Sequence, residues 1–144
     1  MVADIVNGIT MTLGSAYEGY DIYTKDVEQG IETPCFFVQL LKASKRPLIG
    51  QRHIRDYPFD IQYFPEHDGD NEEMMDVGDA LEECLADITL QNGDMIHGND
   101  MSYEIVDGVL HFFVTCSVIM MEVKQEESMD KYGLTVEVRN GEKH

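Results

Sequence analysis

The sequence predicts an α+β domain, with a mostly antiparallel, mixed sheet of about six strands flanked by two helices. Two segments, residues 3–14 and 71–90, carry apolar residues at helical spacing. Other segments alternate apolar and polar residues or form short apolar runs, as strands do. With 144 residues and 43% hydrophobic content, the chain can bury one core. We therefore expect a single domain over residues 1–123 and a charged extension over residues 124–144.

The first helix is expected over residues 3–14. Asp4 suits the positively charged amino end of a helix, and Gly14 predicts where the helix stops. A short strand follows over residues 20–25. The helix should bury one apolar stripe, Val2, Ile5, Val6, Ile9 and Leu13.

A long hairpin comes next. Residues 34–43 are strongly apolar and predict a central strand. Residues 51–65 alternate and predict its partner, with Pro58 at a bulge or an edge. Residues 44–50 are expected as the turn or arm that joins the two strands. One face of the second strand should carry Tyr57, Phe59, Ile61 and Tyr63.

The clearest element is a second helix over residues 71–90. Asp70 and Glu73 have the spacing of a capping box, which predicts its start. Three strands should follow, over residues 94–98, 101–106 and 110–123. An Asp-Gly pair at 107–108 predicts the last hairpin turn. The buried stripe of the helix is expected to be Met74, Val77, Leu81, Cys84, Leu85 and Ile88.

Charge is divided unevenly along the chain. Residues 56–123 contain no lysine or arginine, yet they hold 17 of the 28 acidic residues. The net charge of −18 argues against binding to free nucleic acid and against a peripheral membrane role. Such a pattern suits a chain that meets other proteins by charge, or lies beside a polyanion without gripping it. Five of the ten cations directly precede the acidic block: Lys42, Lys45, Arg46, Arg52 and Arg55.

No segment indicates export or membrane insertion. Residues 1–13 lack the basic start of a signal peptide, and no apolar tract reaches transmembrane length. Cys35, Cys84 and Cys116 show no CxxC spacing and lie among apolar residues. We expect them to be reduced core thiols of a cytosolic chain.

No motif indicates an enzyme, a cofactor or a metal. The acidic turn at residues 66–73 lacks the ligand register of an EF-hand and is expected to be a solvated turn that caps the helix. The histidines never show zinc-ligand spacing, and His111 is expected as a partly buried strand residue. Adjacent acids such as Glu72 and Glu73 point different ways on a helix, so they form no carboxylate dyad. No serine, cysteine or glycine loop has the setting of a nucleophile or a phosphate cradle.

Two charged sets remain as candidate docking surfaces. The basic cluster Lys42, Lys45, Arg46, Arg52 and Arg55 is either a solvated loop or an arm that docks on an acidic neighbour, such as a second copy. Reversing Lys45 and Arg46 to Glu at low salt tests the docking arm. The second set is an acidic stripe opposite the apolar side of the second helix: Glu72, Asp76, Asp79, Glu83 and Asp87.

The extension offers one further segment. Residues 134–138 alternate like a strand, but the expected domain holds no obvious partner for them. They are either a strand that adds to a neighbour's sheet or a frayed end.

Five segments occur in order along the chain: DIVNGI, YDIYTKDVEQGIETPCFFVQLL, YPFDIQYFP, the NEEM helix start and MSYEIVDGVLHFFV. Together they resemble the tail terminator family of long-tailed bacteriophages, in the form common in phages and prophages of Gram-positive bacteria. The resemblance covers about residues 1–123.

This resemblance implies a non-enzymatic virion protein without a cofactor. Copies, usually six, would form a ring at the head-proximal end of the tail tube after assembly in the host cytoplasm. The ring would stop tube growth and offer the surface that joins the head, so its partners would be itself, the tail tube protein and a head–tail connector protein. DNA would pass through without specific binding, and the acidic stripe would face either the lumen or the outside. The alternatives are a head–tail connector or neck protein, and a non-viral acidic module that binds proteins.

Overall fold

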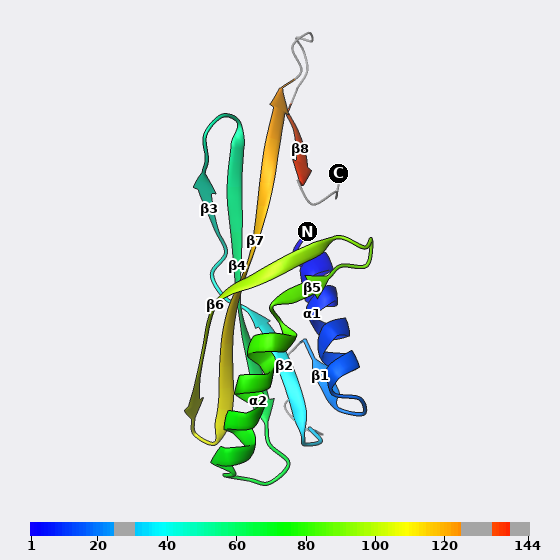
Figure 1. Ribbon diagram of the computed structural model, residues 1–144, viewed down its shortest axis with the longest axis vertical. Coiled ribbons are helices and arrows are strands. Elements are labelled where there is room, and N and C mark those ends of the chain that lie inside the picture. The colour runs from blue at the N-terminus through cyan, green and yellow to red at the C-terminus, as the bar shows by residue number, and fades with distance from the viewer. Residues whose placement is uncertain (25–30, 125–133, 139–144) are drawn as a thin grey trace.

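The computed structural model describes residues 1–24, 31–124 and 134–138 (Figure 1). Two helices and eight strands follow one another along these residues. The order is α1 (Val2–Ala16), β1 (Asp21–Tyr23), β2 (Cys35–Leu40), β3 (Ser44–Pro47), β4 (Arg52–Phe64), α2 (Asn71–Cys84), β5 (Asp87–Thr89), β6 (Met95–Val106), β7 (Val109–Lys124) and β8 (Leu134–Val138). The predicted fold class, α+β with two helices and a mixed sheet, is confirmed.

The eight strands form one sheet. Its main path is β1-β2-β4-β7-β6-β5, while β3 pairs with β4 and β8 pairs with β7. Only β1 and β2 run parallel, and every other pair is antiparallel. β4 and β7 pair from Arg52 opposite Met121 to Tyr63 opposite Leu110. These two long strands extend from one end of the molecule to the other. At one end they reach beyond the helices, and there β3 and β8 lie beside them (Figure 1).

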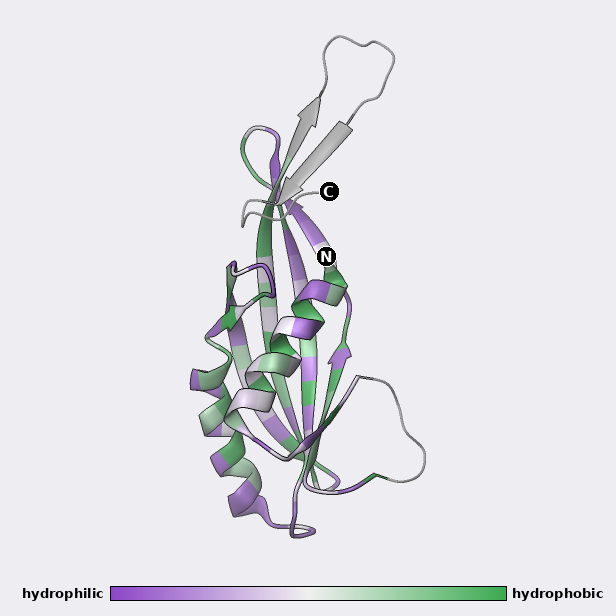
Figure 2. Ribbon diagram, turned by 90° about the vertical axis from the view of Figure 1, so that its right-hand side faces the viewer, coloured by the Kyte–Doolittle hydropathy of each residue, from purple (hydrophilic) through white to green (hydrophobic). Residues whose placement is uncertain are grey.

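Both helices cover the same face of the sheet (Figures 1 and 2). α1 packs against β5, β1 and β2, whereas α2 packs against β7 and β6. The buried residues beneath them come from alternate positions of each strand, because successive strand residues point to opposite faces. In β4 these positions are Tyr57, Phe59, Ile61 and Tyr63, as predicted.

The first helix runs two residues past its predicted end. Gly14 lies inside α1, and the helix closes at Tyr17, whose N–H donates to the Leu13 carbonyl over 2.8 Å. Gly8 has a packing reason, since a Cβ there would lie 3.0 Å from side-chain atoms of both Ile88 and Leu90. α1 therefore approaches β5 closely where Gly8 faces it.

The second helix begins as predicted but ends six residues early, at Cys84. Leu85 caps it, and Asp87–Thr89 forms β5. Leu85, Ile88 and Leu90 are all buried, so they fit a helical stripe and the entry into a short strand equally well. Strand pairing decides the outcome, because Ile88 lies opposite Ile96 of β6. Asp87 is therefore a strand residue and does not continue the acidic stripe along the helix.

β6 unites two predicted strands. The segments predicted over 94–98 and 101–106 form one strand, Met95–Val106, and the predicted turn at Asn99 and Asp100 is a bulge with a register shift. Asp100 adopts a φ of 53°, which accommodates the extra residue. Gly98 is required beside this bulge, because a Cβ there would lie 2.3 Å from the Leu85 carbonyl oxygen.

Two segments expected outside the sheet belong to it. Residues 44–47 form β3 instead of part of a turn, so strand pairing in the predicted hairpin continues to Pro47 opposite His53. Pro58 lies where pairing to β4 changes from β2 to β3, and its carbonyl accepts the Leu41 N–H over 2.8 Å. The nitrogen of Pro58 also points toward the side of β4 on which β2 and β3 lie. The proline therefore removes no hydrogen bond between β4 and β7. β8 does have a partner within the chain, namely β7 from Met120 to Lys124, so the expectation of no such partner is wrong.

Candidate docking surfaces

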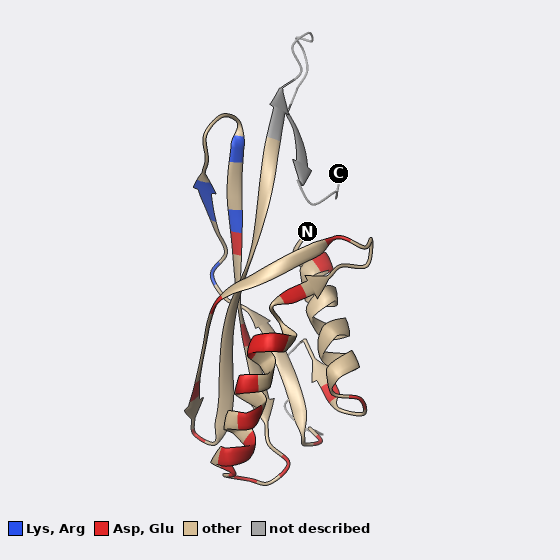
Figure 3. Cartoon of the chain, viewed as in Figure 1, with Lys and Arg blue, Asp and Glu red and all other residues tan. Residues whose placement is uncertain are grey.

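The predicted basic residues lie on one projecting feature, which we call the arm (residues 42–56). The arm comprises β3, its turn and the first part of β4. Lys42, Lys45, Arg46 and Arg52 are exposed, whereas Arg55 is half-buried with its guanidinium 5.6 Å from the Tyr57 ring centroid. Blue residues gather on the arm in Figure 3, and red residues gather on the body below it.

One arm cation is already bound within the chain. Arg46 holds Asp56 in a forked contact, with Nε 2.7 Å from Oδ2 and Nη2 3.3 Å from Oδ1. Ser117 donates a third hydrogen bond to this carboxylate over 2.6 Å. The hydrogen bond from Arg46 lowers the pKa of Asp56, although burial opposes the shift. Arg46 thus stabilises the arm, and among the described residues no carboxylate forms an ion pair with Lys42, Lys45 or Arg52.

The tip of the arm combines charge with apolar surface. Ile49 is 87% exposed and Leu48 is also exposed. Beside them lies a concave site of about 350 Å³. It is lined by Lys45, Pro47, Leu48, Gly50, Gln51, Arg52 and His53. An exposed isoleucine next to unpaired cations is a surface suited to an amphipathic partner.

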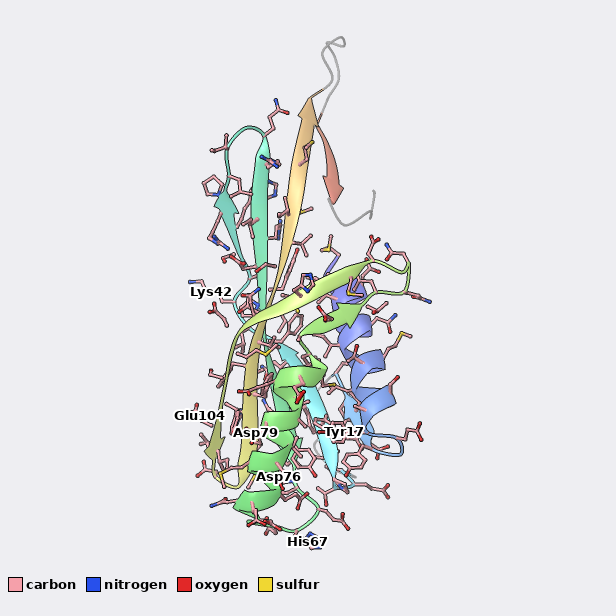
Figure 4. The ribbon with its side chains drawn as sticks, viewed as in Figure 1. Tyr17, Lys42, His67, Asp76, Asp79 and Glu104 are labelled. Carbon is pink, nitrogen blue, oxygen red and sulfur yellow. The ribbon has the colours of Figure 1, made fainter. Side chains whose placement is uncertain are left out.

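Four of the five residues of the predicted acidic stripe lie on α2, and the fifth lies on β5. Glu72, Asp76, Asp79 and Glu83 are exposed along α2, but Asp87 lies on β5, where its Oδ1 is 2.6 Å from His97 Nδ1. Asp79 accepts a hydrogen bond from Tyr103 over 2.8 Å, which raises the pKa of that phenol. Figure 4 places Asp76 and Asp79 on α2, apart from Lys42 at the base of the arm. The structure brings four of the five acids together and keeps all of them away from the arm tip.

Met75 interrupts this acidic surface. It is 45% exposed on α2, next to Asp76 and one turn away from Glu72 and Asp79. Met75 is not among the described residues that form the core or pack against it. We call Glu72, Met75, Asp76, Asp79 and Glu83 the α2 face. Its composition, apolar at one point and acidic around it, mirrors the chemistry of the arm tip.

The amino end of α2 is fixed by Asp70 and Glu73. Asp70 Oδ1 accepts the Glu73 N–H over 3.0 Å, which confirms half of the capping box. In a capping box, the Glu73 carboxylate would accept a hydrogen bond from the Asp70 N–H. Instead it accepts from Tyr63 Oη at 2.5 Å, Glu66 N at 2.8 Å and His67 N at 3.3 Å. Burial alone would raise the pKa of Glu73, but these hydrogen bonds outweigh burial and lower it.

His67, Asp70 and Glu73 also form a group whose ligand atoms lie within 4.8 Å of one another. The hydrogen bonds just described account for both carboxylates without a cation, because they close the turn onto the helix. His67 is exposed, and its Nδ1 lies 3.5 Å from Glu73 Oε1. The arrangement is therefore that of a helix cap.

The sheet face without helices is polar at its centre. Asp60 is only 7% exposed there, and its Oδ2 lies 3.0 Å from His111 Nδ1 and accepts from Gln62 Nε2 over 3.2 Å. Gln62 also donates to Gln39 over 3.2 Å. His111 is partly buried on a strand, as predicted. This network satisfies a buried carboxylate on an otherwise uncovered face.

The cysteines have the environments expected of core thiols. Cys35 and Cys116 are buried, Cys84 is half-buried, and all three are free. Burial raises the pKa of Cys35 to about 11 and that of Cys116 to about 12, so both thiols are protonated at neutral pH. Such thiols are poor nucleophiles.

The apolar members of both surfaces escaped the sequence-based prediction. Ile49 and Met75 occur in segments that were interpreted by their charged residues, and both are exposed in the structure. A break in the pattern gave a usable signal for Met75, since it lies outside the apolar stripe of its helix. No comparable signal marks Ile49.

None of the helices among the described residues is long and apolar enough to cross a membrane. A search of curated proteins finds no significant match to the chain. The model of the family described as "Phage tail terminator protein" matches residues 4–128. This match spans nearly all of α1, all of α2, the body of the sheet, the arm and the whole of β7. The chain belongs to the phage tail terminator family.

Proposed function

We propose that this tail component is the terminator that caps the head-proximal end of the tail tube, stops its elongation and provides the surface to which the filled head attaches. The observation that carries the proposal is the family match over residues 4–128. The separation of charge supports it, since a ring requires two different surfaces on each copy. The arm and the α2 face are two such surfaces.

The proposed assembly is a closed ring, usually of six copies, that contacts the tail tube protein on one side and a connector protein on the other. DNA passes through its opening without specific binding. An acidic wall would suit that passage, because it repels phosphate instead of gripping it. The ring is assembled in the host cytoplasm and has no enzymatic role. Binding of the purified chain to double-stranded DNA at physiological salt would contradict this part of the proposal.

The test is electron microscopy of particles made by a phage or prophage that lacks this gene. Loss of termination gives overlong or headless tails, and expression of the wild-type chain from a plasmid restores their length. Tails of normal length beside unattached, filled heads would instead indicate the second candidate, a head–tail connector. Normal, fully joined particles would reject both functions.

A further inference from the structure

We propose that the arm tip of one copy docks on the α2 face of the next copy, with Ile49 against Met75 and with Lys45 and Arg52 among the surrounding carboxylates. This inference rests on the proposed ring and names the contact that would hold it together. Its partner is a second copy of this chain.

The first argument is that both surfaces carry exposed apolar side chains and charged groups without an ion pair among the described residues. Ile49 is 87% exposed and Met75 is 45% exposed, so each leaves apolar area in water. Among the described residues, no ion pair involves Lys45 or Arg52 and none involves Glu72, Asp76, Asp79 or Glu83. The cations of the arm tip could therefore pair with the carboxylates of the α2 face, and the two exposed apolar side chains could cover each other.

Separation within one chain is the second argument. The arm projects past the helices at one end of the sheet, and the amino end of α2 lies toward the other end (Figures 1 and 3). Both are anchored in the same rigid ladder, since β4 pairs with β7 from Arg52 to Tyr63. The arm tip cannot reach the α2 face of its own chain, so only a neighbour can bring the two together.

Shape is the third argument. The concave site beside Ile49 has a volume of about 350 Å³ and is lined by Lys45 and Arg52 as well as by Pro47 and Leu48. A side chain that projects from a helix, with carboxylates one turn before and after it, fits a hollow of this size and sign. Met75 projects in that way between Glu72 and Asp79. A contact between two different surfaces is heterologous, which is the kind that closes into a ring.

The test uses two charge-reversed variants of the full chain. The arm variant carries Lys45→Glu and Arg52→Glu. The helix variant carries Asp76→Lys and Glu83→Lys, which avoids the capped first turn and the Asp79–Tyr103 hydrogen bond. Arg46 is left intact because it holds Asp56 within the arm. Assembly is measured by native mass spectrometry and sedimentation at low ionic strength and millimolar chain concentration.

We expect the wild type to associate, and each variant alone to associate roughly ten- to a hundredfold more weakly, as loss of charge pairs at an interface implies. The equimolar mixture of the two variants should recover wild-type affinity, because the acidic arm of one meets the basic helix of the other. The recovered assemblies should contain even numbers of copies in alternation. A control with Glu18→Lys and Glu104→Lys, both exposed and outside the two surfaces, should associate at least as well as the wild type.

A second pair of variants keeps every charge. Ile49→Ser and Met75→Ser should each weaken association, whereas Met11→Ser, at a residue 54% exposed on α1, should not. Circular dichroism establishes that each variant is folded. The inference is overturned if the wild type stays monomeric under these conditions, if the variants associate like the wild type, or if mixing them restores nothing. The tail-length experiment is independent: normal tails without the gene would reject termination, whatever the purified chain does.

Discussion

Glu73 shows how one side chain joins three elements. It lies in the first turn of α2, accepts from Tyr63 of β4, and binds two N–H groups of the turn between them. Its sequence context indicated a capping partner for Asp70, and Asp70 does cap the helix. The inward direction of the Glu73 carboxylate could not be predicted, because it depends on where Tyr63 lies in the folded sheet.

Glu73→Gln should reduce the free energy of unfolding by about 1–3 kcal/mol at neutral pH. The pKa of Glu73 is lowered in the folded chain from an ordinary value of 4.5, so the carboxylate contributes stability above that pH. This contribution disappears as the pH falls through the lowered pKa. The difference between variant and wild type should therefore shrink on acidification below about pH 4.5, as measured by urea unfolding at several pH values. Glu72→Gln, an exposed neighbour in the same turn, is the control; an equal, pH-independent loss in both variants would contradict the assignment.

Gly98 is the residue where packing leaves no room for a side chain. A Cβ at this position would lie 2.3 Å from the Leu85 oxygen and 2.8 Å from Val114 Cγ2. We expect Gly98→Ala to destabilise the chain by roughly 1–3 kcal/mol, because backbone must move. Gly14→Ala is the matched comparison, since the nearest atom there is 3.9 Å away and the position is helical. It should leave the thermal midpoint unchanged or raise it, and a similar loss in both would argue against the steric explanation.

At the scale of elements, α2 illustrates what periodicity can and cannot establish. Its start was predictable from Asp70 and Glu73, which act locally. Its end was not, because Leu85 and Ile88 continue the helical spacing while β5 competes for the same residues. Pairing with β6 decides between helix and strand, and the pairing residues of β6 lie six to ten positions further along the chain.

The cap of α2 has a measurable share in stability. Asp70→Ala removes the acceptor of the Glu73 N–H and should cost about 1 kcal/mol of unfolding free energy. Asp68→Ala removes the same charge two residues earlier, from an exposed turn position. Chemical denaturation should separate the two variants, and equal effects would mean that charge near the helix end matters more than the hydrogen bond.

Strand pairing near the arm was harder to foresee than the body of the sheet. The alternation of β4 was clear from its sequence, and its buried side was assigned correctly. β3 is only four residues long, fully exposed and rich in charge, so its composition is that of a loop. It is a strand because residues 44–47 lie opposite residues 53–56 of β4, which the hairpin brings together.

For the molecule as a whole, net charge opposes folding, whereas the proposed contact between copies depends on the separation of charge. With a net charge of −18, the acidic side chains repel one another more strongly in the folded chain than in the unfolded one. Added sodium chloride should therefore raise the thermal midpoint of the monomer, yet weaken the proposed contact between arm and α2 face. A variant with Glu72→Gln, Asp76→Asn and Glu83→Gln should show a smaller rise with salt in differential scanning fluorimetry. A midpoint that falls with salt would show that attractive ion pairs dominate instead.

The continuous ladder of β4 and β7 fixes a length as well as a fold. Because one pair of strands carries both the core and the arm, the distance from body to tip is set by the number of residues in the hairpin. Adding two residues to each of β3 and β4 would preserve which side chains face each way and move the tip outward by about 7 Å. Adding one residue to each strand would move the tip outward by about 3.4 Å but would turn Ile49 and its neighbours to the opposite side. The arm can therefore be lengthened without reversing the side on which it presents Ile49 only in steps of two residues per strand.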